Sequence, residues 1–187
     1  MIEYVVFYDE WLPLPKAEFN VLAMVAEHGG TYAGNLSDMC RYLNVTPQSR
    51  NREPLRSAIE SLTSKVFLSC ENRGRTYHLK VIPRETEVKL PRLWVQSVIR
   101  HDYSSESVAF TQVLKVFAWI MLNRMEVVTN AMIAAELGIS ESTVCAAKNV
   151  LQHEYENIIK KKVSQKWGDG FRSVGQELVA NAWWTEI

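Results

Sequence analysis

The sequence has few cysteines, no net charge and no long hydrophobic run. Its three cysteines lie far apart in a chain of 187 residues, and none belongs to a CxxC pair or a Cys/His cluster with zinc spacing. The most apolar run, residues 113–122, is interrupted by Lys115 and is much shorter than the roughly 20 residues of a membrane-spanning helix. The acidic and aromatic N-terminus does not resemble a signal peptide. These absences predict a cytoplasmic protein with no bound metal and no membrane partner.

Signatures of catalysis are also missing from the sequence. It contains no GxxxxGK phosphate loop and no GxSxG nucleophile turn, and no second histidine follows His153-Glu154 at metalloprotease spacing. We therefore expect the protein not to be an enzyme and to use no cofactor.

The charges balance overall but are distributed unevenly. Lys+Arg and Asp+Glu each total 21, which counts against a uniformly basic coat for nucleic acid. Residues 1–45 carry two cations and six anions, whereas residues 46–92 carry ten cations and five anions. The second stretch therefore has a net charge of +5 and is the candidate for contact with a polyanion.

An internal repeat in the order of predicted elements organises the chain. Each half has a Leu-Pro entry, an apolar helix, a short Thr-Tyr or Val-Val stretch and a second helix. Hydrophobic stripes at helical spacing predict the apolar helices at residues 15–27 and 107–123. The second helices are expected to begin at Asn35 and at Thr129 or Asn130, which are good N-caps.

The same turn is predicted after the second helix of each half. Leu43-Asn44-Val45-Thr46 aligns with Leu137-Gly138-Ile139-Ser140. The pattern predicts a left-handed residue, a buried aliphatic side chain and a hydroxyl that caps the next helix, which is the turn of a helix-turn-helix. Third helices are predicted at residues 54–64 and 141–155, so the first half carries five extra polar and basic residues, within 48–53.

A hairpin is predicted after each third helix. The β-prone runs 66–70 and 76–82 flank one turn signal, and the runs beginning at Ile158 and Phe171 flank Gly168-Asp169-Gly170. We therefore predict a mainly α fold with small β wings, of the α+β class. Two winged helix-turn-helix domains in tandem are expected at residues 1–83 and 107–187, with a linker and a short connecting helix at 84–106. Residues 4–8 are interpreted as a strand packed on the first domain or as a swapped arm.

The Leu-Pro entries (Leu14-Pro15 and Leu90-Pro91), the aliphatic first helices, the two turn tetrapeptides and the hairpins resemble those of tandem winged-helix proteins. Plasmid replication initiators and phage or DnaD-like replisome organisers of bacterial mobile elements are similar in layout. Winged-helix transcription regulators share all of these features. The resemblance implies binding of double-stranded DNA, in replication initiation or in transcription regulation, and both roles stay open.

The candidate DNA-binding residues of the first domain are the polar and basic ones around its third helix and its wing tip. Arg pairs with guanine and Asn or Gln with adenine in the major groove, and cations bind phosphates. The helix candidates are Gln48, Ser49, Arg50, Asn51, Arg52 and Arg56, and the wing candidates are Arg73 and Arg75. The alternative interpretation is a solvated basic loop.

The second domain offers fewer candidates on its helix and more on its wing. On the helix they are Ser142, Thr143 and Lys148, and on the wing they are Lys160, Lys161, Lys162 and Lys166. Lysines also protect strand edges against aggregation, which is the alternative role of the wing. The aromatic residues Trp167, Trp183 and Trp184 complete a core or form an interface, and a homodimer stays open. The competing hypothesis for the whole chain is a winged-helix scaffold for protein–protein interaction without DNA binding.

Overall fold

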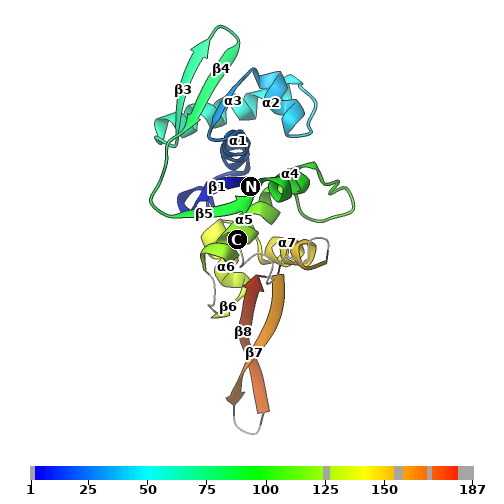
Figure 1. Cartoon of the computed structure of the whole chain (residues 1–187). Coiled ribbons are helices and arrows are strands. Elements are labelled where there is room, and N and C mark those ends of the chain that lie inside the picture. The colour runs from blue at the N-terminus through cyan, green and yellow to red at the C-terminus, as the bar shows by residue number, and fades with distance from the viewer. Residues whose placement is uncertain (1–2, 124–126, 154–157, 168–169, 181–187) are drawn as a thin grey trace. The chain divides into compact units, whose positions relative to one another are not determined.

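The structure is a computed structural model that describes residues 3–123, 127–153, 158–167 and 170–180. The chain divides into two compact units, Met1–His101 and Asp102–Ile187. Both combine helices with small antiparallel sheets, so the fold is α+β (Figure 1). Within the described ranges, no helix combines the length and the hydropathy needed to cross a membrane.

Unit 1 contains a series of helix, strand, helix, helix, strand and strand. Its members are α1 (Lys16–Glu27), β2 (Thr31–Gly34), α2 (Leu36–Tyr42), α3 (Ser49–Ser64), β3 (Leu68–Arg73) and β4 (Thr76–Val81). The strands form one antiparallel sheet in the order β2-β4-β3, so the last strand lies between the first two. The β3–β4 hairpin extends beyond the helices of its unit (Figure 1).

A second, two-stranded sheet in unit 1 contains residues that the sequence predicts to be part of a linker at 84–106. Strand β1 (Tyr4–Tyr8) pairs antiparallel with β5 (Glu87–Pro91), and helix α4 (Arg92–Arg100) follows directly. Residues 84–101 therefore belong to the compact unit, which ends at His101. In β5 the apolar Val88 and Leu90 are buried and the charged Glu87 and Lys89 are exposed, the alternation of a strand with one buried face. The strand at residues 4–8 and the helix at 92–100 are confirmed.

The core of unit 1 is built around α1. Every side chain from Glu18 to Glu27 is buried, because sheet, helices and β1 surround this helix. The rings of Phe7 and Phe19 stack at 5.9 Å, and Trp11 meets Phe7 edge-on at 6.2 Å. These large side chains fix the position of α1, against which α3 packs.

The predicted turn between α2 and α3 is confirmed in part. Asn35 caps α2 by accepting hydrogen bonds from the backbone N–H groups of Ser37 and Asp38. Asn44 has φ +56°, and the Val45 N–H donates to the Cys40 carbonyl at 2.9 Å, which closes the helix end. The expectation of a buried aliphatic after this residue is wrong, because Val45 is 42% exposed. Thr46 does not cap α3 either, since the N-cap is Gln48.

Helix α3 begins earlier than predicted. It spans Ser49–Ser64, with Pro54 inside, so the five extra residues are helical and not a loop. Pro54 has no N–H to donate to the carbonyl of Arg50, four residues earlier. Because the N–H groups of a first turn need no such partner, proline suits that position, and the sequence predicts a helix start at Pro54. In the structure, the first turn of α3 begins at Ser49 and precedes Pro54. The polar residues 49–53 therefore belong to the helix, and Gln48 is its N-cap.

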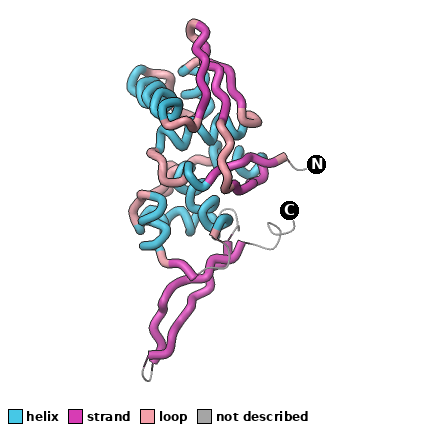
Figure 2. The backbone as a smooth tube through the Cα atoms, turned by 90° about the vertical axis from the view of Figure 1, so that its left-hand side faces the viewer, coloured by secondary structure: helices cyan, strands magenta, loops and turns pink. Residues whose placement is uncertain are grey.

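Unit 2 repeats the series found in unit 1. Its members are α5 (Phe110–Leu122), β6 (Val127–Val128), α6 (Asn130–Leu137), α7 (Glu141–His153), β7 (Ile158–Trp167) and β8 (Gly170–Ala180). The sheet order is β6-β8-β7, which corresponds strand for strand to β2-β4-β3. The β7–β8 ribbon runs outward from the helices of this unit (Figure 2). The described part of the chain therefore contains one topology twice.

The caps of unit 2 follow the predicted pattern. The Thr129 side chain accepts from the Met132 N–H at 3.2 Å at the start of α6, and Gly138 at its end has φ +63°. Ser140 then accepts from the Thr143 N–H at 3.1 Å and caps α7. In the core, burial lowers the pKa of Lys115 on α5 to about 8.

Candidate nucleic-acid interface

The first turn of α3 concentrates polar and basic side chains at the surface of unit 1. Gln48, Ser49 and Arg50 are exposed, and Asn51 and Arg52 are half-buried. No acidic residue lies in this turn, and the Gln48 side chain makes no capping hydrogen bond. The backbone N–H groups at a helix start carry a partial positive charge that disfavours cations by about 0.3–1 kcal/mol each. The helix dipole therefore does not favour the two arginines of this turn.

Asn51 has a structural role in the turn before α3. Its Nδ2 donates to the Thr46 carbonyl at 2.8 Å and lies 3.3 Å from the Thr46 hydroxyl. A side chain held in this way fixes the approach of the chain to the helix. Asn51 is one of the residues predicted to contact DNA, but its side-chain amide already donates to the backbone of the preceding turn.

Two further arginines of the predicted set form ion pairs with neighbouring acids. Arg56 lies 3.0 Å from Glu53 one turn earlier on α3, and Arg73 lies 3.0 Å from Glu71 on β3. All four side chains are about half or more exposed, and exposed pairs are worth only about 0–1 kcal/mol. A hydrogen bond to Tyr77 of β4 is the largest cause that raises the pKa of Arg56, so this residue also joins α3 to the hairpin.

Three arginines of the predicted set remain without an ion pair among the residues that the structure describes. Arg50 and Arg52 lie in the first turn of α3, and Arg75 lies in the turn between β3 and β4. Arg50 and Arg75 are exposed, and Arg52 is half-buried. These guanidinium groups are the cations best able to meet an external anion.

The exposed surface of α7 differs from that of α3. Glu141, Ser142, Cys145 and Asn149 are exposed. The Ser142 and Thr143 hydroxyls lie 2.8 and 2.7 Å from the Ser140 hydroxyl, so both belong to the start of the helix.

Lys148 is not at the surface, which corrects its assignment as a DNA contact. It is 2% exposed, and its Nζ donates to the Asn130 side chain of α6 at 2.8 Å. The sequence carried a signal for this, because Lys148 falls on the stripe of Val144, Ala147 and Leu151 at helical spacing. The described surface of α7 therefore exposes no Lys or Arg.

The lysines of the second wing lie in β7. Lys160, Lys161 and Lys162 pair with residues 178, 177 and 176 of β8, and Lys166 pairs with Phe171. Only the backbone of this ribbon is described, and the side chains of these four lysines and of Trp167 lie outside the described residues. Trp183 and Trp184 lie outside them entirely.

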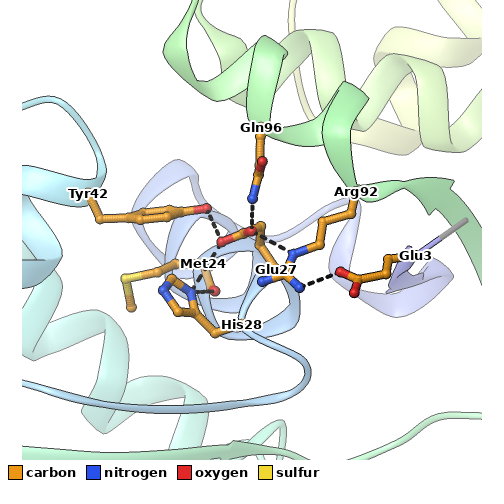
Figure 3. A network of polar contacts seen from close by, with 7 residues as sticks. All are labelled: Glu3, Met24, Glu27, His28, Tyr42, Arg92 and Gln96. Atoms are coloured by element: carbon orange, nitrogen blue, oxygen red, sulfur yellow. Dashed lines mark hydrogen bonds and ion pairs between the residues drawn. The ribbon is translucent and has the colours of Figure 1, made fainter.

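Unit 1 contains a buried polar network that the sequence does not predict. Glu27, at the end of α1, is 4% exposed and accepts hydrogen bonds from Tyr42 of α2 at 2.9 Å and from Arg92 of α4 at 3.0 Å (Figure 3). Gln96 of α4 donates a third hydrogen bond, and His28 lies 3.3 Å away. The network joins α4 to α1 and α2, and no local pattern in the sequence predicts it.

The same network sets the charge state of Glu27. Burial alone raises the pKa of this carboxyl, but hydrogen bonds from Gln96, Arg92 and Tyr42 outweigh it, so the pKa lies below its ordinary value. Arg92 also pairs with Glu3 at 2.7 Å. The hydrogen-bonding capacity of this buried carboxylate is therefore used by side chains of its own protein, and Glu27 connects α1 to α2 and α4.

No family model matches the chain, and no curated protein matches it. Within the described ranges, no three His, Cys, Asp or Glu side chains are grouped so that they could hold a metal ion.

Proposed function

We propose that this chain binds double-stranded DNA through two winged helix-turn-helix domains in tandem and has no enzymatic activity. The observation that carries the proposal is the repeated series of helix, strand, helix, helix, strand and strand, with the last strand of each series in the middle of its sheet. In a helix-turn-helix the helix after the turn enters the major groove. This helix is α3 in unit 1 and α7 in unit 2, and the hairpins β3–β4 and β7–β8 are the wings.

Electrostatics at α3 support contact with DNA. Arg50 and Arg52 stand at the positive end of the helix dipole without acidic neighbours in the first turn. Phosphate is the anion that favours such a site, because backbone N–H groups, dipole and guanidinium charges all attract it. Gln48, Ser49 and Arg50 are exposed at the start of the helix, where side chains reach base edges.

The wings and unit 2 have secondary roles in this proposal. Arg75 and Arg73 contact the DNA backbone or the minor groove from the tip of the first wing. Ser142 and Thr143 make polar contacts from α7, and Lys160, Lys161, Lys162 and Lys166 contact phosphates from the second wing. Unit 1 contributes most of the sequence specificity, in replication initiation on a plasmid or phage or in transcription regulation in bacteria. A homodimer would present this set of contacts twice.

The test is a fluorescence anisotropy titration of the full chain with a mixed-sequence duplex at several salt concentrations. Binding at low salt that weakens steeply as salt rises is expected. Arg50→Ala combined with Arg52→Ala should make the slope of log K against log salt less negative by about 2, because each lost phosphate contact contributes about 1. The melting temperature should change little, since neither side chain is buried.

The matched control removes two other cations of unit 1, with Lys16→Ala and Lys89→Ala. Both side chains are exposed and lie outside α3 and the wing. This variant should keep the wild-type slope to within about 0.5, because it loses no phosphate contact. An equal loss in both double variants, or no binding by the wild type at low salt, would defeat the proposal.

The second candidate function is a scaffold for protein–protein interaction, and the surface of α7 favours it for unit 2. Its described surface exposes no Lys or Arg, and Glu141 faces solvent at its start. An acidic side chain there repels phosphate. If the wild type binds no duplex at low salt but forms a defined oligomer in sedimentation, the scaffold function is the better account.

A further inference from the structure

A pocket in unit 1, away from α3 and the wing, has the features of a small-ligand site. It has a volume of about 320 Å³ and is lined by residues of α2, the turn after it and α4, namely Arg41, Tyr42, Asn44, Gln96, Ile99 and Arg100. This volume lies at the lower end of the range for pockets that bind small molecules. Among the described residues that line it, two carry a positive charge and none carries a negative one.

The two arginines approach the pocket from different helices. Arg41 belongs to the last turn of α2, and Arg100 ends α4. Arg41 pairs with Asp38 at 2.8 Å, but both side chains are about half or more exposed, so the pair is weak and its guanidinium is free to turn towards a ligand. Each helix also ends here with about half a negative charge, which is less than the full charge of each guanidinium.

Two of the lining residues, Tyr42 and Gln96, are held in place by the Glu27 network. The Tyr42 hydroxyl and the Gln96 amide N–H both donate to Glu27, so the two side chains are held in place before any ligand binds. Burial and the charge of Glu27 raise the pKa of Tyr42, and the charges of Arg100 and Arg92 oppose this rise. Arg100 and Tyr42 both line the pocket.

The Glu27 carboxylate does not make this site repel anions. Its charge faces Arg92 at 3.0 Å, which it shares with Glu3, and its oxygens already accept hydrogen bonds from three side chains. The pocket itself therefore offers two planar donors that match the oxygens of a phosphate. It also offers acceptors for hydroxyl groups, namely the Gln96 and Asn44 amide oxygens, and an apolar wall at Ile99.

We propose that this pocket binds a small organic phosphate with hydroxyl groups, such as a sugar phosphate, and so bridges α2 to α4. Arg41 and Arg100 hold the phosphate, and Gln96 and Asn44 accept hydrogen bonds from the hydroxyls. The site does not depend on DNA binding, because none of its residues lies on α3 or on a wing. A failed duplex titration would leave it intact.

The test is a calorimetric titration of the full chain with ribose 5-phosphate, with ribose and inorganic phosphate as partial probes. Saturable binding of one equivalent of ribose 5-phosphate is expected, with weaker binding of phosphate and none of ribose. Arg41→Gln combined with Arg100→Gln should weaken binding at least tenfold, since a hydrogen bond to a charged group is typically worth that much. The single variant Arg100→Gln should lose part of this affinity and keep the wild-type melting temperature.

The control replaces two exposed cations of the same unit that lie outside the pocket, α3 and the wing, with Lys16→Gln and Lys89→Gln, and should bind ribose 5-phosphate within twofold of the wild type. An equal loss in the control and in the pocket variants would overturn the assignment, because it would show a general charge effect. Absence of saturable binding by the wild type at millimolar ligand would overturn it as well. So would displacement of ribose 5-phosphate by duplex DNA, which would make the pocket a contact for DNA phosphates.

Discussion

The carboxylate of Glu27 is expected to hold unit 1 together, and Glu27→Gln tests this with almost no change in side-chain volume. The amide keeps one oxygen as an acceptor but replaces the other with an NH₂ group. That group must face donors, because Tyr42, Arg92 and Gln96 all donate to the carboxylate in the wild type. At least one donor therefore loses its partner in a site where the residue is 4% exposed.

The structure sets the size of the effect. Removing one partner of a fully buried ion pair costs about 3–5 kcal/mol. The Arg92 side chain is 35% exposed and keeps its pair with Glu3, so solvent offsets part of this cost. We expect a loss of about 2–3 kcal/mol in the free energy of unfolding of unit 1. For a domain of about 100 residues this lowers the melting temperature by roughly 10–20 °C.

Hydrogen exchange of the full chain, read by mass spectrometry, is the suitable assay because it resolves α1 and α4 from unit 2. Exchange in α4 should accelerate most, since Arg92 and Gln96 are its links to α1. The control is Glu85→Gln, which removes an exposed carboxylate and should change nothing measurable. If Glu27→Gln stays within about 0.5 kcal/mol of the wild type, the carboxylate is not the joint between these helices and the reasoning is refuted.

Further predictions concern pH, backbone strain, capping and one buried lysine. Because the pKa of Glu27 is lowered in the folded state, this carboxylate stabilises the fold at pH values above the ordinary carboxyl pKa of about 4.3. The contribution is lost as pH falls through the lowered pKa. The difference in unfolding free energy between wild type and Glu27→Gln, measured by urea titration, should therefore shrink below about pH 4. Val66 has φ +62° and is 57% exposed, so Val66→Gly should raise the free energy of unfolding by about 0.5–1 kcal/mol, and a decrease would argue against strain there. Thr129→Ala removes the cap of α6 and should cost about 1 kcal/mol in calorimetry, with Ser at this position restoring most of it. Lys148→Ala should destabilise unit 2 by about 2 kcal/mol or more because a buried side chain is lost, and an unchanged melting temperature would show that Lys148 faces solvent.

Features set by neighbouring residues were predictable from the sequence. Asn35 and Thr129 cap their helices as expected, and Asn44 and Gly138 take the left-handed conformation that ends them. Each depends on a few adjacent residues, so a local pattern is sufficient. Both hairpins follow from the same kind of signal.

Features set by distant residues were not predictable in this way. The local sequence of β5 predicts a linker, because its partner β1 lies at the other end of the unit in sequence. The first turn of α3 was not predicted, because Pro54 follows it and proline is more frequent at a helix start than in a helix interior. Glu27 gave no signal at all, because its partners come from α2 and α4 and only the fold brings them together.

The most direct test of DNA binding by α3 and the first wing is site-specific photocrosslinking. A photoreactive amino acid is placed in separate variants at position 49 on α3, at position 75 in the wing turn and at position 89 on β5, all of them exposed in the wild type. Irradiation with a duplex at low salt should give adducts from positions 49 and 75 and none from position 89. Adducts from position 89 alone, or from none of the three while the duplex is bound, would contradict the account.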